Sequence, residues 1–293
     1  MAIGALGISA CDGDGTTINQ YILPESDMKV VPMGTYPVGD PTKNPMDTVT
    51  LSQFYICDHE VTQKEWLEIF DKNPSNFQDN PAAGEVPGNR PVENVNWYMA
   101  IAYCNKRSIK EGLTPCYRVN GVTDWENLAF DDIPTTEDAD WNNAYRISDE
   151  GYRLPTEAEW EVAARGGIAK EVEMWAGTTD SEEENLKKYM WYSANSDDKT
   201  HEVKKKKPNG YGLYDMSGNV WEWCEDYYGN KYPYPETLPD PYGADNYNSS
   251  YGIVARGGDY GNNANGCRTF FRNYFKAYAG FLFRGFRVVR SAR

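Results

Sequence analysis

Histidine is scarce in this chain of 293 residues, which contains only His59 and His201. A metal site built on several histidines is therefore excluded, and a Ser-His-Asp triad would have to use one of these two. His59 lies in Cys57-Asp58-His59-Glu60, a pattern typical of a turn or a strand end. We expect a structural or surface role for both histidines, so catalysis by histidine is disfavoured.

Long apolar runs are lacking as well. No segment approaches the roughly 18 apolar residues that a membrane-spanning helix requires, so none is predicted. The six cysteines are scattered without any CxxC spacing, which disfavours zinc and thioredoxin-type chemistry. Apart from Cys11, discussed below, an odd number remains, so at least one thiol is unpaired among Cys57, Cys104, Cys116, Cys224 and Cys267.

Positive charge is also in short supply, because the formal net charge is −15. A phosphate backbone would be repelled by such a surface, so nucleic acid is disfavoured as a partner. The charge is uneven: residues 256–293 carry eight basic residues against the single acid Asp259, a local +7, so the remainder carries −22. Apolar residues make up 40% and aromatic residues 14%, enough for a substantial core.

The first residues lack a basic start but contain a possible lipidation site. Small apolar residues end in Ile8-Ser9-Ala10-Cys11 and are followed by acidic, glycine-rich sequence, which resembles the lipobox of bacterial lipoproteins. The resemblance implies a diacylglycerol on Cys11, residues 1–27 as signal remnant and tether, and a place on the bacterial cell surface or outer membrane. A short disordered tail with a chance cysteine remains the alternative, because no Lys or Arg precedes the apolar stretch.

Strand-like and helix-like patterns alternate along the rest of the chain and predict an α+β fold. Short strands are expected at residues 28–33, 48–56, 253–256 and 285–290. Helical period occurs at residues 60–70, 97–110 and 157–164, the last with Thr156 and Glu159 placed for a capping box. Long loops rich in Asn, Asp, Pro, Gly and Tyr, at residues 74–90, 120–142 and 229–249, need some device that orders them.

Six groups of residues follow one another in an order that resembles a known family. They are Pro32-Met33-Gly34; Glu60-Val61-Thr62 with Trp66; Arg90-Pro91-Val92-Glu93-Asn94-Val95-Asn96-Trp97; Tyr152-Arg153-Leu154-Pro155-Thr156-Glu157-Ala158-Glu159-Trp160-Glu161; Asn209-Gly210-Tyr211-Gly212-Leu213-Tyr214-Asp215-Met216-Ser217-Gly218-Asn219-Val220-Trp221-Glu222-Trp223; and Arg256-Gly257-Gly258 with Gly285-Phe286-Arg287. This succession resembles the formylglycine-generating-enzyme, or sulfatase-modifying-factor, family. The resemblance implies one domain over residues 28–293 with an irregular C-type-lectin-like α+β fold.

The same resemblance implies a structural calcium ion that orders loops. Its ligands would be the carboxylates of Asp215 and Glu222 and the backbone oxygens of Gly218 and Val220, and such hard oxygen ligands suit calcium. The alternative is that the two carboxylates bond the loop backbone.

Copper(I), which catalytic members of the family hold between two cysteines, is not expected here. The strand Arg256-Gly257-Gly258 is followed by Cys267 at the second cysteine position, but Asn262 stands at the first. An amide is a poor ligand for a soft ion, so no copper site is predicted and Cys267 is expected to be a small buried residue. A copper-dependent oxidase that makes formylglycine on sulfatase cysteines is therefore the alternative to a non-enzymatic function.

The C-terminal segment also resembles the variable regions of diversity-generating retroelement proteins, including those of treponemes, which are surface lipoproteins. The shared frame is Arg256-Gly257-Gly258, Cys267-Arg268, Arg272 and Gly285-Phe286-Arg287, so residues 256–287 would be the variable region. Template adenines that mutate in asparagine codons yield Tyr, Phe, Asp, Gly, Leu, Ser and Ala but not Trp, Met, Gln, Glu or Lys. From Asp259 to Arg284 the chain has none of the first four and only Lys276 of the last.

We therefore expect a diversified ligand-binding surface on a non-enzymatic, monomeric surface protein. Tyr and Phe offer rigid contact area, and Asn and Gly offer adaptable hydrogen bonding. A protein on host or neighbouring cells is favoured over a sugar, because no Glu-Pro-Asn-like loop is present. A buried aromatic cluster and a subunit of an envelope complex are the alternatives. The expected contact residues are Asp259, Tyr260, Gly261, Phe271, Tyr274, Phe275, Tyr278, Phe281, Leu282 and Phe283, and the expected scaffold arginines, paired with acids, are Arg256, Arg268, Arg272 and Arg287.

Overall fold

Short strands in four separate sheets dominate the computed structural model, which describes residues 27–42, 46–167, 173–229, 239–241 and 252–292. The first three sheets contain β1, β4 and β11; β10, β7, β8 and β9; and β2 and β3, while β5 and β6 form the fourth. The strands are β1 (Met28–Val31), β2 (Gly34–Val38), β3 (Asp47–Leu51), β4 (Phe54–Cys57), β5 (Tyr117–Arg118), β6 (Tyr145–Arg146), β7 (Trp221–Tyr227), β8 (Ile253–Arg256), β9 (Asn273–Phe275), β10 (Arg284–Gly285) and β11 (Val289–Ser291).

Helices are few and mostly short. The α-helices are α1 (Gln63–Leu67), α2 (Trp97–Lys110), α3 (Ala139–Asn142), α4 (Glu157–Ala164) and α5 (Glu183–Leu186), and the 3₁₀ helices are η1 (Pro87–Asn89), η2 (Phe130–Asp132) and η3 (Ala264–Cys267). The predictions for α2 and α4 are confirmed to the residue, and Thr156 with Glu159 forms the predicted capping box. The helix expected at residues 60–70 begins later, because Thr62 is its N-cap.

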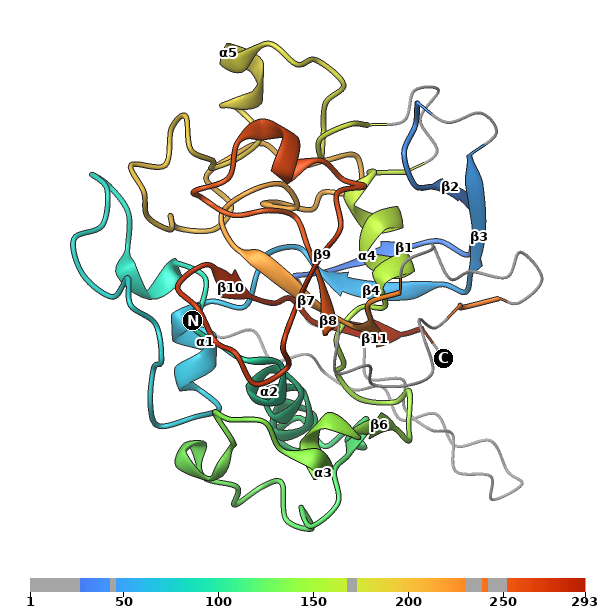
Figure 1. Cartoon of the computed structure of the whole chain (residues 1–293), viewed down its shortest axis with the longest axis vertical. Coiled ribbons are helices and arrows are strands. Elements are labelled where there is room, and N and C mark those ends of the chain that lie inside the picture. Colours follow the sequence, from blue (N-terminus) through green and yellow to red (C-terminus); the bar gives the residue numbers. More distant parts are fainter. Residues whose placement is uncertain (1–26, 43–45, 168–172, 230–238, 242–251, 293) are drawn as a thin grey trace, which may run out of the picture.

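The two ends of the described chain meet on one central strand. β1 and β11 both pair with β4 in antiparallel fashion, which places residues far apart in sequence side by side (Figure 1). The single strand predicted at residues 48–56 is wrong, since β3 pairs with β2 and β4 belongs to another sheet. The strand pairing is interrupted after Leu51, because the backbone N–H of Ser52 donates to the Asp240 carboxylate at 2.6 Å.

The second sheet carries the C-terminal segment in the middle of the molecule (Figure 1). β7 lies between β8, which is antiparallel to it, and β10, which is parallel to it, and β9 pairs with the outer edge of β8. The strand predicted at residues 285–290 is split, because β10 ends at Gly285 and β11 begins at Val289 in a different sheet.

Aromatic side chains fill the core on either side of these sheets. Trp66, Trp160 and Trp223 are fully buried, and the Trp66 ring stacks on Tyr103 with ring centroids 5.6 Å apart. All five described cysteines are buried free thiols, Cys267 among them as predicted. Burying large aromatic rings is the main favourable term in a fold with so little regular secondary structure.

Buried charged side chains order the long loop at residues 74–90. The Arg90 guanidinium, which is fully buried, donates to the carbonyl oxygens of Phe77, Asp79 and Asn80 at 3.0–3.3 Å. The Glu93 carboxylate accepts the backbone N–H groups of Asn76 and Phe77 at 2.5 and 2.8 Å. Side chains thus supply the partners that an irregular backbone cannot give itself.

Across the described residues, the longest helices are still too short, or too polar, to cross a bilayer. The proportions of helix and strand confirm the predicted α+β class.

Candidate functional site

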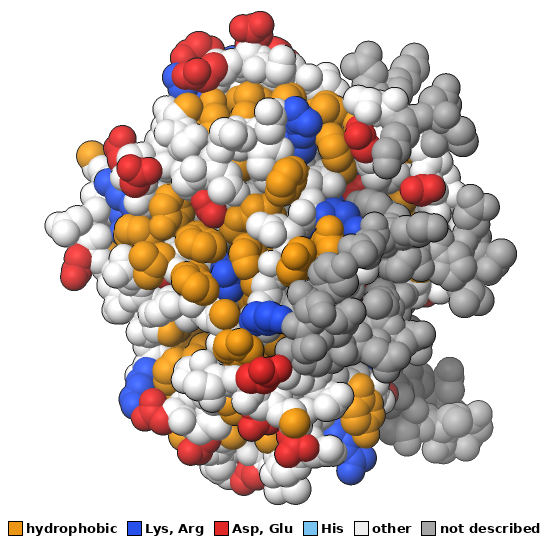
Figure 2. Space-filling view, viewed as in Figure 1, with side chains coloured by type: hydrophobic (Ala, Val, Ile, Leu, Met, Phe, Trp, Pro, Cys, Tyr) orange, Lys and Arg blue, Asp and Glu red, His pale blue; other side chains and the backbone are white. Residues whose placement is uncertain are grey.

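Exposed aromatic and aliphatic side chains gather where the C-terminal segment crosses the surface. Phe271, Tyr274, Phe281 and Leu282 expose 41%, 38%, 47% and 40% of their surface. Figure 2 shows hydrophobic side chains collected on this side of the molecule, over the region where Figure 1 places β9 and β10. Together with the half-buried Tyr260, Phe275, Tyr278 and Phe283, these four residues are called the aromatic face below.

The two remaining predicted contact residues lie at its margin. Gly261 is exposed, whereas Asp259 is 6% exposed and lies beneath the surface. The Asp259 carboxylate accepts the backbone N–H of Gly261 at 2.6 Å, so it shapes the loop that presents Tyr260. Burial raises the pKa of Asp259.

Hydrogen bonds from outside the segment hold the backbone of the aromatic face. The backbone N–H groups of Asn94, Trp97 and Trp221 donate to the carbonyl oxygens of Phe281, Ala277 and Phe283 at 2.9, 2.8 and 2.8 Å. Asn94 precedes α2, Trp97 is the first residue of α2, and Trp221 begins β7. Because these donors are main-chain groups, the bonds do not depend on which side chain the segment carries.

The first half of the segment is held in the same way. The carbonyl of Asn262 accepts from the Ser193 N–H at 3.0 Å, and Thr269 N–H donates to the Met174 carbonyl at 2.9 Å. β8 pairs with β9 over Ile253 to Ala255 and thereby fixes the strand that carries Tyr274 and Phe275. The main chain of the aromatic face is therefore held by hydrogen bonds that do not involve its own side chains.

Buried ion pairs support this surface from behind. Arg256 contacts Glu161 and lies 3.4 Å from Glu157, which also receives two bonds from Arg272 at 2.6 and 2.8 Å. The third pair joins Arg287 to Glu222. Arg256, Arg272 and Arg287 thus have the predicted scaffold role.

The fourth scaffold prediction, Arg268, is wrong with respect to its partner. Arg268 donates to the side-chain amide of Asn265, and no carboxylate lies within 4.0 Å of it among the described residues. Its guanidinium instead lies over the rings of Trp175 and Phe270, at 6.0 and 5.7 Å from their centroids.

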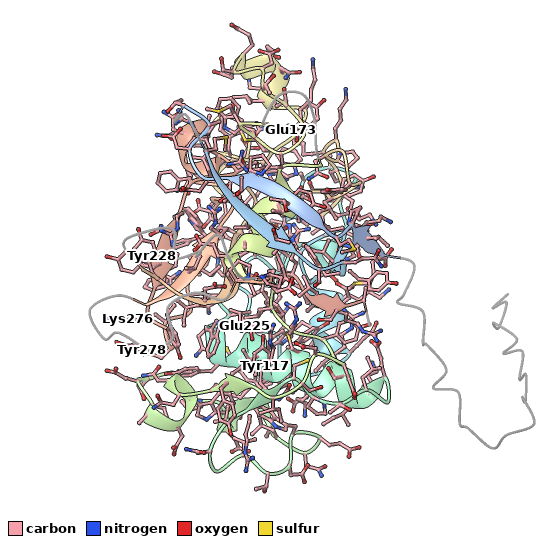
Figure 3. All side chains as sticks on the ribbon, turned by 90° about the vertical axis from the view of Figure 1, so that its right-hand side faces the viewer. Tyr117, Glu173, Glu225, Tyr228, Lys276 and Tyr278 are labelled. Atoms are coloured by element: carbon pink, nitrogen blue, oxygen red, sulfur yellow. The ribbon has the colours of Figure 1, made fainter. Side chains whose placement is uncertain are left out.

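Three residues of this surface were not found from the sequence. The ring centroids of Tyr228 and Tyr274 are 4.4 Å apart. The rings of Phe77 and Tyr260 form a T-shaped contact with centroids 5.4 Å apart. Figure 3 places Tyr228 with Lys276 and Tyr278 along one side of the molecule. The third is Arg284, whose guanidinium lies 3.5 Å from the centroid of the Phe275 ring. The positions of these three residues depend on contacts between distant segments, which the spacing of residues in the sequence does not predict.

The donors present do not fit the two-cysteine copper site considered in the sequence analysis. Cys267 is fully buried, and burial raises the pKa of its thiol, which opposes the thiolate that copper(I) needs. Asn262 uses its side-chain oxygen to accept the Asp259 N–H at 3.3 Å. One protonated sulfur and one amide cannot supply a two-thiolate site.

The loop expected to bind calcium has an excess of buried negative charge. Glu222 shares both carboxylate oxygens with Arg287 at 2.6 Å, and Trp160 Nε1 donates to one of them at 2.7 Å. Asp215 Oδ2 accepts the Lys204 N–H at 2.8 Å, but Oδ1 is buried without a hydrogen-bond partner. Burial raises the pKa of Asp215 to about 6.

Glu60 adds a third carboxylate to this region. It is fully buried, and both burial and the nearby Asp215 hold its pKa well above the usual range. Three buried acids, Glu60, Asp215 and Glu222, therefore lie near two cations, Arg287 and the protonated His59, in this part of the structure. A buried carboxylate oxygen without a hydrogen-bond partner suits a hard cation, so Asp215 fits the calcium assignment, whereas Glu222 would have to share its oxygens with Arg287.

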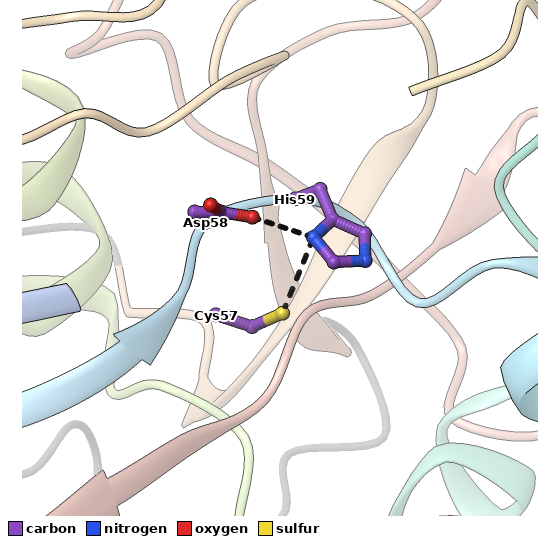
Figure 4. A group of neighbouring side chains, drawn as sticks. All are labelled: Cys57, Asp58 and His59. Atoms are coloured by element: carbon purple, nitrogen blue, oxygen red, sulfur yellow. Dashed lines mark hydrogen bonds and ion pairs between the residues drawn. The ribbon is translucent and has the colours of Figure 1, made fainter. Parts of the chain in front are cut away.

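A second cluster of potential metal ligands lies at the end of β4. Cys57 Sγ, Asp58 Oδ1 and a ring nitrogen of His59 lie within 4.8 Å of one another (Figure 4). Asp58 also contacts Lys204 at 3.0 Å and Lys29 at 3.2 Å. Burial alone would lower the pKa of His59, but the Cys57 sulfur and the Asp58 carboxylate raise it to about 12. A protonated imidazole and two ammonium groups repel a cation, so the cluster is an ion-pair network.

His201, like His59, is buried and structural. Its two ring nitrogens lie 2.8 Å from the Glu85 carboxylate and 2.8 Å from the Ser196 carbonyl, and its ring stacks on Trp191. Both predictions of non-catalytic histidines therefore agree with the packing around these residues.

Known proteins share this architecture. Residues 17–292 match the family described as the sulfatase-modifying factor enzyme 1-like domain. The chaperone protein LppX of Paenibacillus barcinonensis is 33% identical over 302 residues, which cover 97% of this chain and 95% of that protein. The formylglycine-generating enzyme of Thermomonospora curvata is 27% identical over 271 residues, which cover 80% of this chain and 82% of that enzyme.

A solved structure gives the most direct comparison of folds. That of Treponema denticola variable protein 1 has a TM-score of 0.82 and 44% sequence identity, and the match covers 90% of this chain and 94% of that one. The C-type-lectin-like fold expected from the order of the motifs is thereby confirmed.

Proposed function

From the premise that this chain belongs to the sulfatase-modifying factor enzyme 1-like family, we propose that it is a non-enzymatic member that binds protein ligands through the aromatic face. Its similarity to a treponemal variable protein supports this assignment, because that resemblance extends over nearly the whole chain. The ligand would be a protein on a host or neighbouring cell, bound by a monomer of this chain.

The observation that carries the proposal is a set of exposed rings on a main chain that other segments hold in place. Phe281 is 47% exposed, although its carbonyl is fixed by Asn94. Soluble proteins rarely leave an aromatic patch open unless it binds a partner. Rigid rings lose little conformational entropy on binding, and a preformed backbone lowers that cost further.

The site gives no support to the oxidase alternative. The position of the first copper-binding cysteine is Asn262, and the second, Cys267, is buried beneath the surface with a raised pKa. Neither histidine is free to replace them, because the ring nitrogens of His59 contact Asp58 and Glu65 and those of His201 contact Glu85 and the Ser196 carbonyl.

Removing two exposed rings should abolish recognition without unfolding the protein. Random peptides displayed on phage and selected on the immobilised full chain should yield binders that lose affinity by about 30-fold or more for the double variant Phe271→Ser, Phe281→Ser, because aromatic residues at the centre of an interface contribute most of its binding free energy. Each substitution should change the free energy of unfolding by less than about 1 kcal/mol, since the rings are nearly half exposed.

Ile147→Ser provides the matched control, because Ile147 is 54% exposed and lies outside residues 256–287. Peptide affinities, measured by surface plasmon resonance, should not change in this variant. Binders that tolerate the double variant as well as they tolerate Ile147→Ser would contradict the proposed function.

We also propose that Cys11 is lipidated and anchors the protein on the bacterial surface. Cys11 lies outside the described residues, and the proposal rests on the lipobox-like residues that precede it. One residue that carries two or three acyl chains would be held stably in a bilayer. Cys11→Ser should move the protein from the membrane to the soluble fraction, as followed by immunoblotting, and an unchanged distribution would reject the anchor.

Calcium is a further part of the proposal. The ion would be held by the carboxylates of Asp215 and Glu222 and by the backbone oxygens of Gly218 and Val220. It would order residues 215–220, the loop that leads into β7. The support is the unpartnered Oδ1 of Asp215 and the excess of buried carboxylates around it. Oxygen ligands of this kind suit a calcium ion.

Calorimetric titration of chelator-treated protein should detect calcium binding, and Asp215→Asn should weaken it about tenfold or more, because the substitution removes a charged ligand. A calcium concentration of 100 times the Kd should raise the free energy of unfolding by about 2.7 kcal/mol. Asp180→Asn, in an exposed acidic segment, is the control and should leave the titration unchanged. If no heat of binding is observed for the unaltered chain, the calcium assignment is wrong.

A further inference from the structure

One cation lies inside the aromatic face. Arg284 is 4% exposed, and its guanidinium carbon lies 3.5 Å from the ring centroid of Phe275 and 4.4 Å from that of Phe281. Phe283 and Trp223 surround it at 5.4 and 5.6 Å. The exposed part of the aromatic face is thus built around a buried positive charge.

Arg284 differs from Arg256, Arg272 and Arg287 in its lack of a carboxylate partner. Arg256, Arg272 and Arg287 each contact a glutamate at 3.4 Å or less. For Arg284, by contrast, the ion pairs of the described residues include none within 4.0 Å. Asp259 is the acid that acts on it from a greater distance, and that carboxylate is occupied by the Gly261 N–H.

The guanidinium of Arg284 keeps a donor that a carboxylate can reach. Nη1 donates to the Ala279 carbonyl at 2.6 Å, while Nε is buried without a hydrogen-bond partner. Nη2 has no hydrogen bond within the described residues either, but unlike Nε it is not enclosed by the protein. A guanidinium N–H that reaches the surface can form a charge-assisted hydrogen bond with a carboxylate.

The charge of Arg284 itself favours an acidic group at this position. Glutamates pair with Arg256, Arg272 and Arg287, whereas no carboxylate lies within 4.0 Å of Arg284 among the described residues. Burial lowers the pKa of Arg284 to about 9, which still leaves it cationic at neutral pH. Aromatic rings compensate a buried cation only in part, so a buried donor without a partner remains costly until a ligand supplies an acceptor.

We propose that the aromatic face selects protein ligands that present an Asp or Glu side chain flanked by apolar residues, with the carboxylate bound by Nη2 of Arg284. This inference rests on the proposed function and specifies the chemistry of its partner. Phe281 and Leu282, which are both exposed beside Arg284, would contact the apolar flanks of the ligand. The ligand's carboxylate would pair with Arg284 as glutamates of the chain pair with Arg256, Arg272 and Arg287.

The peptides selected on the full chain test the inference directly. Those that require Phe271 and Phe281 should contain an acidic residue, and its replacement by the neutral amide should weaken binding to the unaltered chain about tenfold or more. Arg284→Met should weaken the same peptides to a similar extent. The two changes combined should be little worse than either alone, because both remove one interaction.

Arg268→Met is the matched control, since Arg268 belongs to the same segment but donates to Asn265. It should leave the contribution of the acidic residue unchanged. If Arg284→Met does not fold, as judged by circular dichroism, the acid-to-amide comparison on the unaltered chain still decides the matter. Peptides that bind the aromatic face without an acidic residue, or effects of Arg284 and the peptide acid that simply add, would overturn the inference and leave the proposed function intact. Peptides indifferent to Phe271 and Phe281 would instead reject the proposed function.

Discussion

Replacing Arg287 with methionine is expected to lower the free energy of unfolding by about 3–5 kcal/mol, the cost of leaving a buried carboxylate without its partner. Arg287 and Glu222 are both fully buried and joined by two hydrogen bonds of 2.6 Å. Removal of the guanidinium would leave Glu222 in a region that also contains the buried Glu60. Urea denaturation, followed by tryptophan fluorescence in the presence of a chelator, measures the change without a contribution from metal ions.

The double variant Arg287→Met, Glu222→Gln tests whether the loss comes from the uncompensated charge. Gln can still accept the Trp160 N–H but carries no charge, so the double variant should be more stable than Arg287→Met alone by about 2 kcal/mol. A single variant that loses less than about 1 kcal/mol would show that this ion pair is not a support of the fold. A double variant no better than the single one would assign the loss to the other bonds of Arg287, which reach the carbonyls of Cys57 and Tyr214.

Local features of the fold could be predicted from the sequence because their causes are local. Thr156 and Glu159 form a capping box within four residues, and α2 has its N-cap Asn96 and its apolar face in one continuous segment. The strands were harder to place. Whether residues 48–56 form one strand or two depends on Asp240, which is 188 residues away from Ser52 and binds its backbone.

In the candidate site, too, some features could be predicted from the sequence and others depend on distant residues. Its exposed aromatic residues could be predicted from composition, since so many rings beside glycines and asparagines exceed what a core can hold. Phe77 and Tyr228 could not be found in this way, because only the folded loops bring them beside Tyr260 and Tyr274. Arg284 looked in the sequence like its neighbours Arg272 and Arg287. What distinguishes it is the lack of a carboxylate within reach, and this becomes visible only in three dimensions.

Because other segments hold the main chain of the aromatic face, a small change in the backbone should disturb recognition more than most changes of surface side chains. Gly252 precedes β8 and faces β9, and a Cβ atom at this position would lie 2.0 Å from the carbonyl oxygen of Phe275. That distance is far shorter than any real contact, so Gly252→Ala must push β9 away from β8. Tyr274 and Phe275, which β9 carries, would then be displaced.

Gly252→Ala is therefore expected to lower the free energy of unfolding by about 3 kcal/mol, the upper end of the usual cost of overpacking, and to weaken peptide binding although no side chain of the aromatic face is altered. Urea denaturation and surface plasmon resonance measure the two effects. Gly88→Ala is the control, because its new Cβ would meet only Lys64 Cβ at 3.7 Å, an ordinary contact, and its stability should stay within about 0.5 kcal/mol of the unaltered chain. Full peptide binding by Gly252→Ala would mean that recognition does not depend on the β8–β9 pairing, and the argument for a rigid, externally held face would then fail.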